Sequence, residues 1–156
     1  MGNRSPLQCY VHKADPADHP AILETLAEYV GRDDEAHSPD SLALSTRYMD
    51  VEALLGSSAA LAAALKHAAP SAVFELWQDP FPSAADGHYV GHVPGTGTHE
   101  GACNAEGELL IPVRKVAESL REAPGGITVE MWLATEGRRQ FGADVLAQLA
   151  AFDRRW

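Results

Sequence analysis

The spacing of apolar residues along the chain follows two different periods, and each period predicts a different kind of element. A period of two over residues 42–49 and 127–133 is typical of a strand with one buried face. Short apolar runs that are rich in β-favouring residues and bounded by turn residues predict strands over 7–12 and, most clearly, over 72–79. We therefore expect four strands from these segments.

Other segments carry apolar residues three or four positions apart, which is helical spacing. We predict helices over four of them: 15–30, 57–69, 112–123 and 136–152. Gly31, Pro70 and Pro124 follow the first three. Glycine ends a helix by adopting the left-handed conformation at low cost, and proline cannot continue one. These residues therefore support the predicted helix ends.

The middle of the chain predicts a hairpin, in which strands over 88–93 and 98–104 are joined by a loop at 94–97. A short strand over 108–111 follows a turn. The predicted order is therefore β-α-β-α-β-β-β-β-α-β-α. Early alternation of strands and helices followed by hairpins indicates an α+β fold, with one mixed β-sheet and helices packed on it.

Length and composition suit a single globular domain spanning residues 1–156, because 46% of the residues are hydrophobic and 22% are charged. No apolar run approaches the ~20 residues that cross a bilayer. Residues 1–6 also lack the apolar core of a signal peptide. We expect a cytoplasmic protein without membrane association, whose two cysteines, Cys9 and Cys103, are thiols.

The formal net charge of −10 is distributed unevenly. Residues 123–156 hold four arginines and four acidic residues, so the whole excess lies in residues 1–122. A negative field of this size disfavours binding to nucleic acid and to anionic lipid. It suits a basic protein partner.

The sequence contains no P-loop and no Gly-x-Ser-x-Gly nucleophile motif. One cluster of candidate metal ligands lies on the predicted hairpin: His88, His92, His99 and Cys103. If Val93 pairs with Thr98, His92 lies opposite His99, and all four side chains point to the same face. His92 and His99 could then bind a zinc ion.

The same geometry also argues against this site. His88 and His92 are four residues apart, which is roughly 13 Å along an extended strand at about 3.3 Å per residue. One ion cannot reach all four side chains unless the strand bends. A loop of odd length would also change which side chains share a face. We therefore expect no cofactor, with zinc as the alternative.

Three further side chains lie on predicted strands. Glu75 lies within an apolar run, where burial could raise its pKa and suit it to act as a general acid. Trp77 and Trp132 are out of phase with the neighbouring aliphatic residues, so both would project from the opposite face of the sheet. That face is covered either by the chain's own helices or by a partner, and we name both tryptophans as candidate partner-binding residues.

Two stretches carry a loose resemblance to known proteins. These are VFELWQDP at 73–80 and CNAEG at 103–107. They resemble small uncharacterised proteins of GC-rich actinobacteria, and the Ala-rich, Lys-poor composition is typical of such bacterial genomes. The resemblance covers about the middle third of the chain and implies no activity, cofactor or site residue.

Two interpretations of function follow. We favour a non-enzymatic accessory, immunity-like or assembly factor that binds a protein through its surface, because the chain is acidic, lacks a catalytic motif and has candidate outward tryptophans. The alternative is a small metal-dependent hydrolase with a His/Cys site on the hairpin at 88–103.

Overall fold

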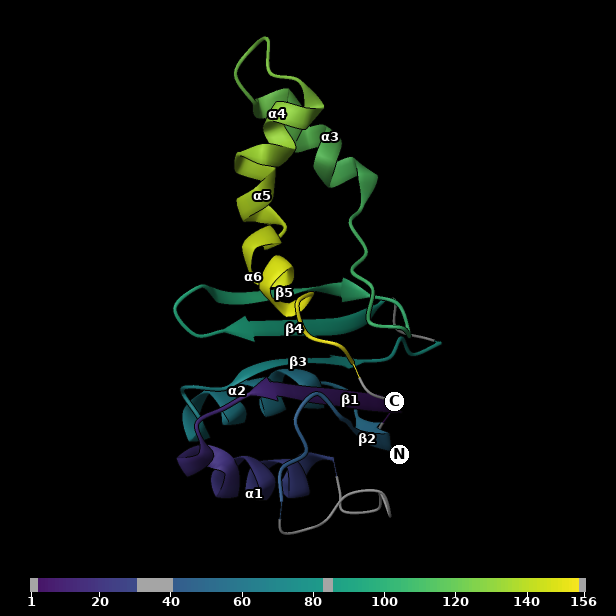
Figure 1. The fold of residues 1–156 in the computed structure, drawn as a ribbon. Helices are drawn as coiled ribbons and strands as arrows, with labels where there is room; N and C mark the ends of the chain where they lie inside the picture. The colour runs from purple at the N-terminus through teal and green to yellow at the C-terminus, as the bar shows by residue number, and fades with distance from the viewer. Residues whose placement is uncertain (1–2, 31–40, 83–85, 155–156) are drawn as a thin grey trace.

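The computed structural model describes residues 3–30, 41–82 and 86–154. These residues form one five-stranded sheet with helices on both faces (Figure 1). The strand order is β2-β1-β3-β4-β5. The bounds of the strands are β1 Arg4–Lys13, β2 Arg47–Leu54, β3 Val73–Gln78, β4 Gly87–Val93 and β5 Gly97–Cys103. The α+β class is confirmed.

Neighbouring strands of the sheet are antiparallel at each pairing, so the prediction of a mixed sheet is wrong in this respect. The reason lies in the position of β1. Strands β2 and β3 run in the same direction and are joined through a helix, as in a β-α-β unit, but β1 lies between them and runs the opposite way. The early alternation of strands and helices therefore produces no parallel neighbours.

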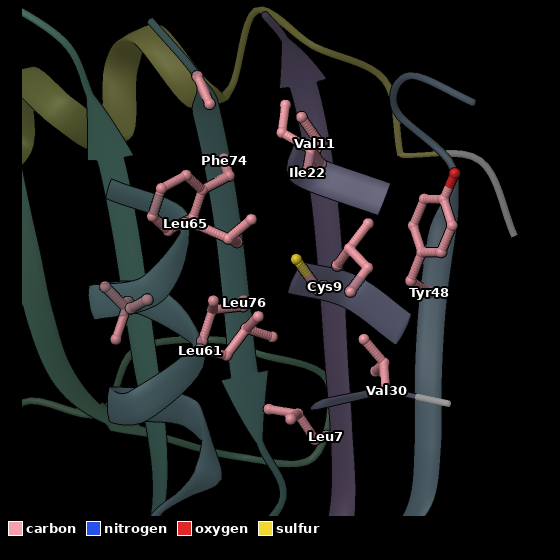
Figure 2. Close-up of a cluster of buried hydrophobic side chains, with 14 of the residues drawn as sticks. Leu7, Cys9, Val11, Ile22, Val30, Tyr48, Leu61, Leu65, Phe74 and Leu76 are labelled. Atoms are coloured by element: carbon pink, nitrogen blue, oxygen red, sulfur yellow. The ribbon is translucent and has the colours of Figure 1, made fainter. Parts of the chain in front are cut away.

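Helices α1 (His19–Tyr29) and α2 (Ser57–Ala68) cover one face of the sheet. Period-two alternation sends Leu7, Cys9 and Val11 of β1 to this face, and the α1 residue Ile22 packs among them. Figure 2 shows this core between the strands and the two helices. Because its members are aliphatic, aromatic or thiol side chains, this face has the composition of an ordinary core.

The opposite face is covered by helix α6 (Ala143–Leu149) and by the segment that follows β5. Val145 and Leu149 of α6 pack against the strand residues Val73 and Val93. A second cluster on this face contains Trp77 and residues from its neighbouring strands. The central strand β3 is thus covered on both faces, which explains why its sequence is a continuous apolar run rather than an alternating one.

Residues 110–140 form an arm that extends away from the sheet and contains three helices (Figure 1). They are α3 Val113–Glu122, α4 Val129–Ala134 and α5 Glu136–Gln140. Helix α3 buries none of its residues. In the described part of the chain, no helix is both long enough and apolar enough to cross a membrane. Helix α4 buries Trp132 and α5 buries Gly137, so the arm has little core of its own.

The strand predicted over 127–133 is wrong, because these residues begin the helix α4. Thr128 caps this helix by accepting a hydrogen bond from the backbone N–H of Met131. The period-two residues Val129 and Met131 are exposed, and the buried residue is Trp132, which the pattern placed on the other side. A period of two predicts a strand only where a sheet is present to bury one face.

Other predicted boundaries also change. The second strand begins at Arg47 rather than at residue 42, because Ser45 adopts a positive φ of 56° and turns the chain before the strand. The short strand at 108–111 is reduced to one bridge between Cys103 and Leu109. The last helix breaks at Gly142, whose φ is 62°, and divides into α5 and α6. Gly31 lies outside the described residues.

Candidate functional site

The β4–β5 hairpin has a register that differs by one residue from the predicted one. Val93 pairs with Gly97, so the loop has three residues and His92 lies opposite Thr98. His99 lies opposite Gly91 instead. As a result, His88 and His92 point to one face of the sheet, whereas His99 and Cys103 point to the other. The premise of the predicted four-residue site is therefore wrong.

Each of these side chains has neighbours of a different kind. His88 Nδ1 and the Ser58 hydroxyl are 2.8 Å apart, and His92 Nδ1 lies 2.7 Å from the Thr98 hydroxyl. The His99 ring packs against Gly142, and Cys103 is buried beside the strands.

Burial lowers the pKa of both His92 and His99, and it raises the pKa of Cys103 to about 12. Within the described ranges, no group of three His, Cys, Asp or Glu residues could hold a metal ion. The zinc interpretation loses its geometric basis.

Both candidate tryptophans are buried by the chain itself. Trp77 projects from the face opposite Phe74 and Leu76, as its phase predicted, but it is fully covered and its indole N–H donates to the Ala105 carbonyl at 3.2 Å. Trp132 is buried in the arm against Phe141. In this structure the chain itself covers both side chains, so neither presents surface to a partner while these contacts are in place.

The most unusual feature of the fold is a charged network buried beside Trp77. Its centre is Glu75 on β3, whose side chain is only 3% exposed. Tyr89 on β4 donates a hydrogen bond to one carboxylate oxygen at 2.9 Å, and His12 on β1 lies 3.0 Å from the other. Alternation along the three strands brings these residues to one face. A carboxylate in this position requires such partners, because burying an unpaired charge is very costly.

His12 connects this carboxylate to Ser45. The carboxylate can only accept hydrogen bonds. The Nε2 of His12 therefore carries a hydrogen atom and donates a hydrogen bond to Glu75. The Nδ1 of His12 lies 3.0 Å from the Ser45 hydroxyl. Ser45 is held in its left-handed conformation by a backbone hydrogen bond from its N–H to the Val11 carbonyl at 2.7 Å. The three side chains therefore form a Ser-His-Glu relay.

Arg154 completes the network from the segment after α6. Its Nε and Nη2 atoms donate to the two oxygens of Glu75 at 2.8 and 2.6 Å, which is a bidentate ion pair. The guanidinium carbon lies 4.9 Å from the Trp77 ring centroid and 6.0 Å from the Tyr10 ring centroid. Both distances lie within the range of a cation–π contact. The Arg154 side chain remains 31% exposed, so it caps the network from the solvent side.

The electrostatics of Glu75 are the reverse of what its sequence position predicts. Burial raises the pKa of Glu75, but the hydrogen bonds from His12 and Arg154 and the charge of Arg154 outweigh that effect and hold the pKa at about 2. Glu75 therefore does not have the raised pKa that would suit it to act as a general acid. Burial, together with the charge of Glu75, raises the pKa of Tyr89. The low pKa keeps Glu75 ionised at neutral pH.

The relay of Ser45, His12 and Glu75 contains the residue types of a hydrolytic triad, but two observations favour a structural role. The carboxylate is already neutralised by Arg154, and the His12 side chain is completely buried, with Phe152 stacked on its ring at 5.0 Å between centroids. A general base must reach the proton that it removes from a reacting group. The network instead connects β1, β3, β4 and the segment after α6.

The helical arm has an exposed apolar surface. Six of the ten large hydrophobic side chains that are exposed in the described part of the chain lie between residues 110 and 133. They are Leu110, Ile111, Val113, Val129, Met131 and Leu133. Val113 is 82% exposed and Met131 is 56% exposed. Exposed apolar residues in one segment mark an interaction surface more often than isolated ones do.

Sequence reasoning missed most of the buried network, because its members are far apart in the chain. His12 and Arg154 lie 63 and 79 positions from Glu75. The only local signals are the carboxylate of Glu75 within an apolar run and the imidazole of His12 at the end of another. Each signal indicates a buried polar group, but neither indicates its partner.

No curated protein and no solved structure matches this chain. A family model does match, over residues 9–154, and this range includes both the buried network and the helical arm. Because the match covers more than half of the chain, the protein belongs to the family described as "Protein of unknown function (DUF3145)".

Proposed function

We propose that the protein is a non-enzymatic accessory factor that binds another protein through its helical arm, residues 110–140. The observation that carries the proposal is the exposed apolar surface of this arm. Val113, Val129 and Met131 are each more than half exposed, and helix α3 buries none of its residues. Exposing such side chains to water is unfavourable by roughly 25 cal/mol per Å² of apolar surface. A partner that covers them would recover this free energy.

The charge distribution indicates the chemistry of the partner. The arm contains five basic residues and four acidic ones, so its net charge is +1. Because the whole chain has a net charge of −10, the rest of the chain carries −11. An apolar patch on the partner would fit the arm, and basic residues around that patch would face the acidic body. Two copies of this chain would bring two acidic bodies together, which disfavours self-association through the arm.

The proposal places the protein in a bacterial cytoplasm. The Ala-rich and Lys-poor composition supports a GC-rich actinobacterial source. It also supports the choice of experiment, which should use extract from the native host. In that compartment the two buried cysteines, Cys9 and Cys103, would remain thiols.

The test compares arm variants with a matched control in a pull-down from host extract. The arm variant Val113→Glu/Met131→Glu changes two exposed residues and should leave the melting temperature unchanged. The control Val51→Glu changes a side chain that is 60% exposed on β2. We expect one protein to be retained by the wild type and by Val51→Glu, and to be lost from the arm variant. Equal retention by all three proteins would contradict the proposal.

A further inference from the structure

Arg154 occupies a receptor that other parts of the chain build. The receptor consists of the Glu75 carboxylate and the rings of Trp77 and Tyr10, which all lie on strands β1 and β3. Arg154 comes from the segment after α6 and belongs to no strand or helix. The receptor is therefore part of the rigid sheet, whereas its occupant is not.

The shape of the receptor selects a guanidinium group. The two carboxylate oxygens accept two N–H groups that are held in one plane, and the same group lies over an indole ring at 4.9 Å. Arginine satisfies both requirements, because its guanidinium is planar, delocalised and bidentate. A lysine ammonium is a point charge, and it could form only part of these contacts.

The way in which Arg154 is attached to the fold would also allow another arginine side chain to replace it in the receptor. Among the described residues, the backbone hydrogen bonds after α6 extend as far as the Phe152 N–H, which donates to the Leu149 carbonyl at 3.0 Å. Phe152 borders an open cavity of about 430 Å³, so the segment is not closely packed on that side. Asp153 is exposed. Phe152 anchors this segment by stacking on the His12 ring, and beyond it Arg154 is held by the contacts of its own side chain.

We propose that the Glu75 receptor is a binding site for an arginine side chain of a basic protein partner, and that Arg154 fills it in cis when no partner is bound. The charge of −11 outside the arm favours the approach of such a partner. The site lies on the sheet and uses none of the apolar residues of the arm. A negative result for this proposal would therefore leave the function proposed above untouched, and the reverse also holds.

The experiment opens the receptor and offers it a probe. In Arg154→Ala, the probe N-acetyl-arginine methylamide is titrated while the indole N–H signal of Trp77 is followed by NMR. We expect a saturable shift with 1:1 stoichiometry and a dissociation constant on the order of 1 mM. The matching lysine compound should bind at least ~10-fold more weakly, because it cannot form the bidentate pair. Wild-type protein should bind the arginine probe more weakly than the variant, because Arg154 competes.

The control is the double variant Glu75→Gln/Arg154→Ala. It removes both charges and so leaves no unpaired buried ion. We expect it to fold and to show no shift with the arginine probe. If Arg154→Ala does not unfold cooperatively, the titration uses Arg154→Met in its place. Methionine keeps an aliphatic stem like that of the arginine side chain. Three outcomes would overturn the proposal: no binding to either opened variant, equal binding of the arginine and lysine probes, or equal binding to the double variant.

Discussion

A single residue, Glu75, determines much of the chemistry of the sheet face beneath α6. A carboxylate that is 3% exposed must be neutralised or paired, and here Arg154, His12 and Tyr89 all contact it. Removing one partner from a buried ion pair costs about 3–5 kcal/mol, mostly because the other charge is left unpaired. Glu75 therefore connects the position of the segment after α6 to the stability of the whole sheet.

The low pKa of Glu75 predicts acid sensitivity. Because folding lowers this pKa from its ordinary 4.5 to about 2, the ion pair stabilises the folded state fully above about pH 4.5 and progressively less as the pH falls towards 2. The contribution that is lost amounts to about 3 kcal/mol. Urea unfolding between about pH 5 and about pH 2 measures it. We expect the unfolding free energy to fall with pH across this range.

Two variants separate Glu75 from the other carboxylates. Glu75→Gln should be less stable than the wild type at neutral pH and should show a correspondingly smaller loss on acidification. Glu28→Gln changes an exposed residue of α1 and should keep the wild-type dependence on pH. An equally steep loss in Glu75→Gln and in the wild type would show that other groups cause the acid sensitivity.

At the scale of elements, Gly142 determines how the last helices meet the sheet. Its φ of 62° lies in the left-handed region, and a Cβ at this position would collide with the His99 ring. The chain therefore changes direction here, so that α5 belongs to the arm while Val145 and Leu149 of α6 reach the sheet. The periodicity of the sequence is continuous across this break, which is why a single helix was predicted.

Gly142→Ala should destabilise the protein for two separable reasons. The matched variant is Gly95→Ala in the hairpin loop, where φ is 81° and no atom lies near the added Cβ. Gly95→Ala should cost about 1–2 kcal/mol for the left-handed conformation alone. Gly142→Ala should cost more, because it adds the collision with His99. Chemical denaturation of both variants measures the difference.

A third variant tests the assigned cause. Replacing His99 by alanine in the Gly142→Ala protein should recover part of the difference between the two glycine variants, because the colliding ring is gone. Equal destabilisation by Gly95→Ala and Gly142→Ala would mean that helix α6 adjusts its position and that His99 does not constrain it.

The elements that the sequence predicts well are those whose burial is decided locally. The strand at 72–79 and the helix at 57–69 closely match β3 and α2, because each has an unambiguous apolar pattern between clear turn signals. The strand prediction at 127–133 failed because its period-two residues Val129, Met131 and Leu133 are exposed on a helix. No strand of the described sheet lies beside them to bury one face. The prediction for the hairpin cluster failed because a loop shorter by one residue moves two of its four members, His99 and Cys103, to the other face.

At the scale of the whole molecule, the sheet and the arm differ in both charge and packing. The chain outside the arm holds most of the core and a net charge of −11, whereas the arm has a net charge of +1 and few buried residues. The buried network belongs to the sheet, and its members could not be grouped from the sequence because they meet only in the folded chain. The arm was equally hidden, because an apolar stripe on a predicted helix normally indicates burial.

This division predicts two levels of local stability, which native-state hydrogen exchange can resolve. The amides of α3 should exchange through openings that cost on the order of 1–2 kcal/mol, because the helix buries no residue and isolated helices of this length are marginal in water. The amides of β1 and β3, which are paired on both sides, should exchange only near global unfolding, at about 5–15 kcal/mol.

The arm variant Val113→Glu/Met131→Glu should leave the β3 amides unchanged, since both side chains lie on the arm and are mostly exposed. Protection of α3 equal to that of β3 would show that the arm is already stabilised within the chain, and that it needs no partner to cover its apolar residues.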